Sequence, residues 1–102
     1  MYIIKMTEKF EKKFYKIIPK ALQDQTWKRI HKLSDNPFLG KPLSNSFIRE
    51  LKLEKFRIYF AIYKNEVIVL LLDISDKKEQ QKVIDTIKEN RQLLNEFIKN
   101  LN

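Results

Sequence analysis

The side chains with the most useful chemistry are a carboxylate, a lysine, an arginine and a tyrosine within ten residues of one another: Glu50, Lys52, Arg57 and Tyr59. On one surface they could cleave a phosphodiester. Arg57 would stabilise negative charge on the phosphate, and Lys52 or Glu50 would move protons at a 2′-hydroxyl or a leaving oxygen. The same residue types also form ordinary cross-strand ion pairs on a solvated sheet face, so the pattern leaves both interpretations open.

The alternation of polar and apolar residues places these side chains on one face of a predicted antiparallel hairpin. The segments 47–53 and 56–63 have a period of two, and only two residues separate them. Directly opposed residues in a hairpin share a face of the sheet. The opposed pairs on the polar face are then Glu50 with Tyr59, and Lys52 with Arg57. The other face is apolar and is expected to pack under helices through Leu51, Ile58, Phe60, Val69 and Leu71.

The remaining sequence predicts an α+β domain whose elements follow in a simple order. A β-branched strand at residues 2–6 leads into a helix capped by Thr7, and Pro19 marks the break before a second helix. An irregular connection follows at residues 36–43, where two prolines and the only glycine interrupt any periodicity. Three strand-like segments then form an antiparallel meander that completes a mainly antiparallel sheet: 47–53, 56–63 and 67–72.

A long C-terminal helix is predicted after the meander. Asp76 is the expected N-cap, and Glu79 three residues later completes the spacing of a capping box. The polar pair Asn90-Arg91 interrupts the apolar spacing, so a break between two helices also fits. The apolar stripe of residues 91–102 is expected to pack against the same domain, with a second subunit as the alternative.

Length and composition limit the function classes. The chain of 102 residues fits a single domain spanning 1–102. No apolar run reaches the about 20 residues of a membrane span, and no signal-peptide pattern begins the chain, so a cytoplasmic protein is expected. Because cysteine is absent, thiol catalysis and cysteine-ligated metals are excluded, and no nucleotide-binding loop or metal-ligand spacing predicts a cofactor. The formal net charge of +8 favours an anionic partner, either nucleic acid or an acidic protein segment.

Several segments of the chain carry a family resemblance: Asn36–Leu43, Glu50–Phe60, Ile68–Leu72 and Ser75–Gln81. The most specific combination is an Arg-Ile-Tyr-Phe strand, then an aliphatic strand, then the run Asp-Lys-Lys-Glu-Gln-Gln. Together these segments resemble the RelE/ParE toxin superfamily of type II toxin–antitoxin systems. The resemblance covers almost the whole chain, with the elements in the family's order.

The resemblance implies a sheet with helices on one face and a concave opposite face that receives messenger RNA on the ribosome. It implies an endoribonuclease that inhibits translation by metal-independent attack of a 2′-hydroxyl on the adjacent phosphate. Carried over by position, the catalytic candidates are Lys52, Arg57, Lys78 and Glu50, where the last position is basic in some members and acidic in others. The family also implies a cognate antitoxin, which we expect to be acidic and partly disordered when alone.

One position departs from the family pattern. Ile84 stands where RNA-cleaving members commonly have a tyrosine or a histidine. This departure keeps an alternative open, in which the chain is a ParE-like toxin that inhibits DNA gyrase by binding, or an inactive relative. The polar cluster on the hairpin favours cleavage, and the missing tyrosine or histidine favours binding.

Overall fold

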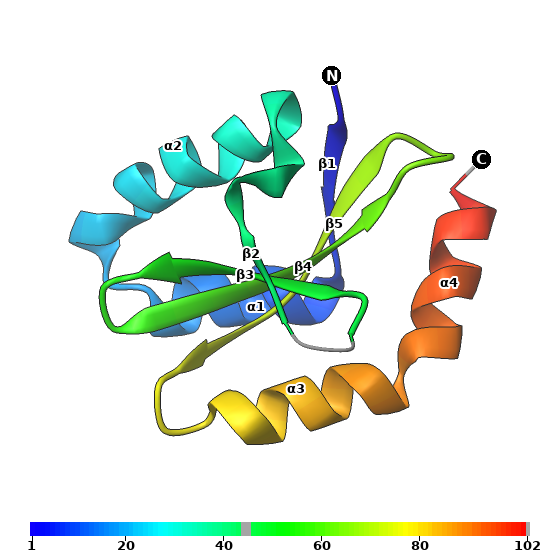
Figure 1. The fold of residues 1–102 in the computed structure, drawn as a ribbon. Helices are drawn as coiled ribbons and strands as arrows, with labels where there is room; N and C mark the ends of the chain where they lie inside the picture. Colours follow the sequence, from blue (N-terminus) through cyan, green and yellow to red (C-terminus); the bar gives the residue numbers. More distant parts are fainter. Residues whose placement is uncertain (44–45, 102) are drawn as a thin grey trace.

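A mixed sheet of five strands organises the residues that the computed structural model describes, which are 1–43 and 46–101 (Figure 1). Its spatial order is β1-β5-β4-β3-β2, in which β1 runs parallel to β5 and the other neighbours are antiparallel. The strands are β1 (Ile3–Met6), β2 (Lys41–Pro42), β3 (Ile48–Leu53), β4 (Phe56–Tyr63) and β5 (Ile68–Asp76). The predicted α+β class and the predicted antiparallel meander are confirmed.

Four α-helices and a short 3₁₀ helix complete this part of the chain: α1 (Glu8–Ile17), α2 (Lys20–Asp35), η1 (Pro37–Leu39), α3 (Gln80–Glu89) and α4 (Arg91–Asn100). Thr7 caps α1 as predicted, because its hydroxyl oxygen accepts the Phe10 N–H at 3.0 Å. Pro19 lies at the N-cap of α2, so it separates the two helices as expected. None of the helices described is long and apolar enough to cross a membrane.

The predicted register of the β3–β4 hairpin is confirmed. Lys52 pairs with Arg57 and Glu50 pairs with Tyr59 across the two strands. The two-residue turn needs a positive φ, and Glu54 adopts φ 47° although glycine would adopt it more easily. Packing of both strands therefore overrides the poor local turn sequence.

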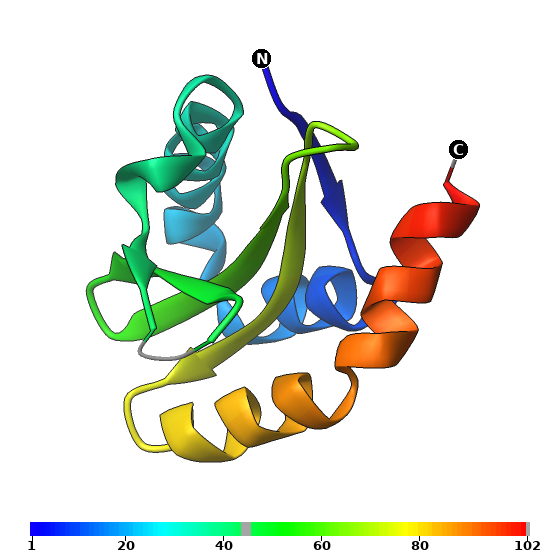
Figure 2. The ribbon, with the colours of Figure 1, turned by 45° about the vertical axis from the view of Figure 1, so that its right-hand side comes forward.

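Helices α1 and α2 cover one face of the sheet (Figure 2). The five residues expected to pack there all belong to one buried cluster, in which Phe10 and Phe14 of α1 and Ile30 and Leu33 of α2 are fully buried. These helical residues recur at a spacing of three or four, which places each set on one helix face. The apolar residues that alternate along the strands therefore pack against the apolar faces of α1 and α2 in this core.

Helices α3 and α4 cover the opposite face, which corrects the prediction of a solvated polar face (Figure 2). Val83, Ile84 and Ile87 of α3 and Ile98 of α4 pack there against the sheet. The reason lies in β5, where every residue except the last is buried, because a central strand covered on both sides carries apolar residues on both faces. The polar hairpin residues consequently lie beside a second core.

The C-terminal helical segment differs from the prediction in its start, and the alternative of a break between two helices at Asn90-Arg91 is confirmed. Asp76 ends β5 and does not cap a helix: its carboxylate accepts the Glu79 N–H at 2.9 Å in a turn, and α3 begins at Gln80. The expected long helix is divided at Asn90, whose side-chain amide donates to the Thr86 carbonyl at 2.9 Å and so competes for a helix acceptor. The break lets α4 turn away from α3.

The stripe of residues 91–102 packs only in part against the domain, and its last residue lies outside the described residues. Ile98 is 1% exposed and Leu94 packs against the second core. The outer side of α4 stays exposed at Leu93, Phe97 and Leu101. The Tyr63 hydroxyl adds a polar contact by donating to Asn95 Oδ1 at 3.1 Å.

The predicted irregular connection at 36–43 contains η1 and the two-residue strand β2. Gly40 lies between them at φ −77°, so its backbone conformation does not require glycine. Space does require it: a Cβ there would overlap the Phe60 ring, with Cε1 at 2.6 Å, and would lie 3.1 Å from the Glu50 carbonyl. Glycine therefore lets β2 approach the sheet.

We predict that Gly40→Ala destabilises the protein by about 1–3 kcal/mol, because the added methyl group overpacks a fully buried ring. Urea denaturation measures the change in the free energy of unfolding. Lys41→Ala, at the exposed neighbouring residue, is the control and should change stability by less than about 0.5 kcal/mol. Equal stability of Gly40→Ala and the wild type would contradict this packing.

Candidate functional site

A buried ion pair lies at the centre of the predicted site. Arg57 Nε on β4 is 3.0 Å from Glu50 Oε1 on β3, and the two side chains are only 9% and 11% exposed. The second carboxylate oxygen, Oε2, accepts a hydrogen bond from Gln80 Nε2 at 3.2 Å. Glu50 therefore joins β3, β4 and the first residue of α3, and both of its oxygens are engaged.

The remaining bonds of Arg57 hold its guanidinium against the hairpin turn. Nη1 donates to the carbonyl oxygens of Glu54 at 3.1 Å and Phe56 at 3.0 Å. A guanidinium carries five N–H donors in a rigid plane, so one group can bond a carboxylate and two carbonyls at once. Arg57 is thus fixed in position, and it lies in a buried environment where sequence alone predicted a solvated one.

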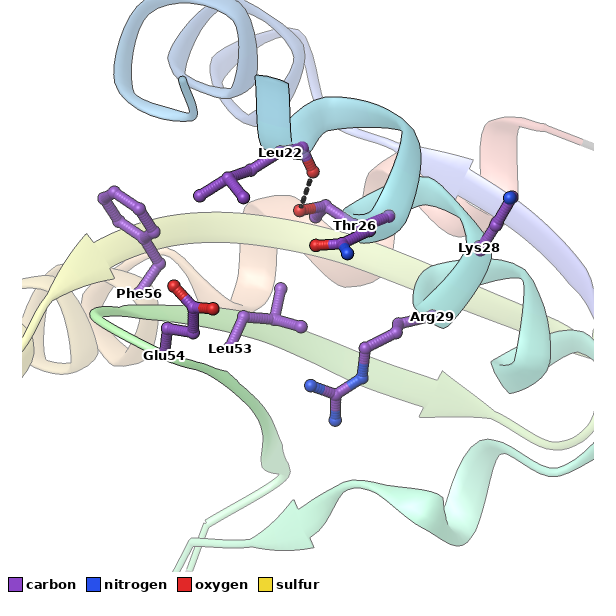
Figure 3. Close-up of a pocket in the computed structure, with 8 residues that line it drawn as sticks. Leu22, Thr26, Lys28, Arg29, Leu53, Glu54 and Phe56 are labelled. Atoms are coloured by element: carbon purple, nitrogen blue, oxygen red, sulfur yellow. Dashed lines mark hydrogen bonds between the residues drawn. The ribbon is translucent and has the colours of Figure 1, made fainter. Parts of the chain in front are cut away.

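Lys52 lies directly opposite Arg57 and is exposed, so an exposed ammonium stands beside a fixed guanidinium. The strand that carries it is also held from α2, because Arg29 Nη1 donates to the Lys52 carbonyl at 2.9 Å. Figure 3 shows the cleft through which Arg29 reaches, between α2 and the hairpin residues Leu53 and Phe56. The backbone of Lys52 is therefore anchored while its side chain remains open to solvent.

Lys78 is exposed in the loop between β5 and α3, two residues before Gln80. Lys41, which the sequence did not single out, lies opposite Glu50 on β2 and so shares its face of the sheet. A two-residue strand gives no periodic signal, so sequence reasoning had no means of placing Lys41. The structure thus brings all the predicted site residues to one region and adds a further lysine.

Tyr59 shares this face as predicted but is fully buried. Its hydroxyl lies 2.8 Å from Ser75 Oγ in a buried hydrogen bond. Burial raises the pKa of Tyr59, and the bond to Ser75 offsets that rise in part. A buried phenol with a raised pKa is suited to holding β4 and β5 together, and it does not offer a proton to a ligand at the surface.

Ile84 lies on α3 and lines a hollow together with Leu43 and the lysines at 77, 78 and 88. It is 8% exposed and packs against the second core. The departure from the family pattern therefore places an aliphatic side chain beside the exposed lysines of the site. It leaves the hollow without a phenol or an imidazole at this residue.

Comparisons with known proteins point to one family and one fold. A family model described as "ParE toxin of type II toxin-antitoxin system, parDE" matches residues 4–81. The intact Escherichia coli RelBE toxin–antitoxin complex contains a chain of similar structure, with a TM-score of 0.64 and 15% identity over 74% of this chain and 96% of that chain. For the isolated E. coli RelE toxin the TM-score is 0.64, with 14% identity over 85% and 99% of the two chains.

The RelBE2 toxin–antitoxin complex from Mycobacterium tuberculosis also matches, with a TM-score of 0.63 and 20% identity over 74% of this chain and 91% of that chain. At these identities the structural matches show a shared fold. The search of curated proteins gave no match.

We predict that Glu50→Ala and Arg57→Ala each destabilise the protein by about 3 kcal/mol, because each leaves the other charge buried without its partner. The double variant should be more stable than the sum of the single changes implies, by about 1–3 kcal/mol, because it removes both charges. Urea denaturation of all four proteins measures this coupling. Lys52→Ala, at an exposed residue of the same hairpin, should change stability by less than about 0.5 kcal/mol. Strictly additive effects would contradict a buried ion pair.

Proposed function

The chain belongs to the ParE toxin family of type II toxin–antitoxin systems, and we propose that this toxin inhibits translation by cleaving messenger RNA on the ribosome. The observation that supports cleavage is the pairing of exposed Lys52 with the fixed guanidinium of Arg57 on adjacent strands. Two further lysines, Lys41 and Lys78, flank the same ion pair. Such a group of cations suits a phosphodiester.

Each candidate then has a separate role in the reaction. The 2′-hydroxyl of a bound nucleotide attacks the adjacent phosphate, which forms a cyclic 2′,3′-phosphate and releases a 5′-hydroxyl. Arg57 stabilises the charge that develops on the phosphate, and Lys52 transfers a proton at the attacking or the leaving oxygen. Lys78 binds a neighbouring phosphate. Glu50 holds Arg57 in place and is a positioning residue, because both of its oxygens are already bonded.

The proposed partners follow from the family and from charge. The solved relatives include RelBE toxin–antitoxin complexes, so an antitoxin is the partner that we assign to this chain. A net charge of +8 favours an acidic antitoxin segment, since opposite charge accelerates association. Ribosomes and messenger RNA are the proposed targets, which places the action of the toxin in the cytoplasm.

Inhibition of DNA gyrase by binding is the second candidate. The matching family model is that of ParE toxins, and Ile84 supplies no titratable group in the hollow beside Lys78. The Glu50 carboxylate is also unavailable as a base. In that case the exposed lysines would contact the target without any chemical step.

We predict that Lys52→Ala lowers the rate of translation-dependent messenger cleavage by about 10²–10⁴-fold, because it removes the proton-transferring group. Lys52 is exposed, so the variant should remain folded, which makes it a cleaner test than a change at buried Arg57. Cleavage ends are mapped on messengers translated by purified ribosomes. Lys32→Ala on α2 is the charge-matched control and should retain cleavage. A wild-type protein that cleaves no messenger but blocks DNA supercoiling by gyrase would support the second candidate.

We predict that Ile84→Tyr increases cleavage, because a phenol would then enter the hollow beside Lys78. Ile84→Phe is the matched control, since it adds the same ring without the hydroxyl. Both variants overpack the second core and should lose about 1–3 kcal/mol of stability. A higher cleavage rate for the tyrosine variant than for the phenylalanine variant is the expected result. Equal rates would mean that a hydroxyl at this position has no part in the reaction.

A further inference from the structure

An exposed aromatic ring stands beside two cations at the other end of the β3–β4 hairpin. The Phe38 side chain on η1 is 51% exposed, and Leu39 beside it is 55% exposed. Arg49 Cζ lies 5.2 Å from the centroid of the Phe38 ring, and Lys64 Nζ lies 5.5 Å from it. The Phe38 N–H donates to the Asn36 side chain at 3.1 Å, which fixes the turn that presents the ring.

The two cations differ in how firmly they are held. Arg49 Nη2 donates to the Gly40 carbonyl at 2.6 Å and to the Phe38 carbonyl at 3.4 Å. Its Nε is buried and has no hydrogen-bond partner among the residues described. Lys64, by contrast, is exposed at the end of β4. Arg49 therefore holds the ring from one anchored position, while the Lys64 side chain can move from the ring to a ligand.

We propose that Phe38, Arg49 and Lys64 form a stacking site for a base of single-stranded RNA, separate from the Lys52–Arg57 site. A base stacks on the exposed ring, and Lys64 turns from the ring to the phosphate of that nucleotide. The inference rests on the proposed function only for the choice of RNA as the polymer. Arg49 pairs with Phe60 and precedes Glu50 by one residue on β3, so its side chain lies on the opposite face of the sheet from Glu50 and Arg57, and the two sites contact different nucleotides.

The chemistry of the stacking site favours RNA over an acidic protein segment as its ligand. The face of an aromatic ring is electronegative and repels a carboxylate, whereas a base of any type stacks on it. Lys64, which lies over the ring, then turns to the phosphate and supplies the backbone contact that single-stranded nucleic acid needs. An acidic peptide would use the two cations but gain nothing from the exposed ring.

The test is fluorescence anisotropy with a labelled 12-nucleotide single-stranded RNA of mixed sequence, without ribosomes and with Lys52→Ala present in every protein so that the RNA stays intact. Phe38→Ala should weaken binding by about 5- to 150-fold, the range expected for loss of one stacked base. Phe38→Trp should bind as tightly as the parent or more tightly. Leu39→Ala is the matched control, since it removes an adjacent exposed apolar side chain without removing the ring, and should bind like the parent.

The contribution of Lys64 is tested by salt dependence. Lys64→Ala should reduce the slope of log affinity against log salt by about one, as expected for loss of one phosphate contact. Lys99→Ala on α4 is the charge-matched control and should leave the slope unchanged. Photocrosslinking of 4-thiouridine RNA to the peptide that contains Phe38 provides an independent readout in the protein with phenylalanine retained.

Several results would overturn the stacking site. The first is an RNA affinity of Phe38→Ala equal to that of the parent. The second is displacement of RNA by poly-glutamate to the same extent from the parent and from Phe38→Ala. The third is a crosslink of the RNA to peptides other than the one that contains Phe38. The outcome is independent of cleavage. If the wild-type protein cleaves no messenger while Phe38→Ala still loses RNA affinity, the proposed function fails and the stacking site stands. If Lys52→Ala abolishes cleavage while Phe38→Ala binds normally, only the stacking site fails.

Discussion

The buried pair of Glu50 and Arg57 is the constraint on which the site and much of the sheet depend. Removing two charges from water is unfavourable unless each finds its full set of partners. Here the carboxylate bonds Arg57 and Gln80, and the guanidinium bonds the carboxylate and two turn carbonyls. A lysine could not replace the arginine, because one ammonium cannot span a carboxylate and the turn with the same planar geometry. The hairpin turn and the start of α3 are thereby fixed to each other.

The burial of this pair follows from the way in which the sheet is covered. Strand β5 is apolar toward both faces, so both faces need helices, and the last helices of the chain supply the second layer. This layer ends near Gln80, where α3 begins. Lys52 and Lys78 lie beyond its edge and are exposed, whereas Arg57 and Tyr59 lie beneath it. The boundary between core and solvent therefore runs through the candidate site.

The sequence was sufficient for the features that depend on local periodicity. The hairpin register, the apolar face under α1 and α2 and the Thr7 cap were predicted because alternation and capping are local signals. The strand β2 was missed because two residues show no period, and with it Lys41 beside Glu50. Covering of the polar face was missed because it was judged from the hairpin alone, whose alternation suggests a solvated face, whereas the neighbouring strand β5 is apolar on both faces and indicates cover on both. The capping role assigned to Asp76 failed because a side chain that accepts an N–H three residues later also forms an ordinary turn.

Net charge gives an incomplete account of where an anion can bind, because some cations serve the fold. Residues 1–45 carry ten basic and four acidic residues. Within that segment, Lys9 and Lys13 of α1 lie 3.2 Å and 2.7 Å from the carboxylate of Asp73, which is 1% exposed on β5. A buried carboxylate needs such partners, so these two lysines hold α1 against β5 and are not free for a ligand. The exposed cations beside the candidate site lie at the edge of the second core, where Lys52 and Lys78 flank the pair of Glu50 and Arg57. The part of the positive charge that bears on function is therefore set by the boundary of the core and not by the number of basic residues in the sequence.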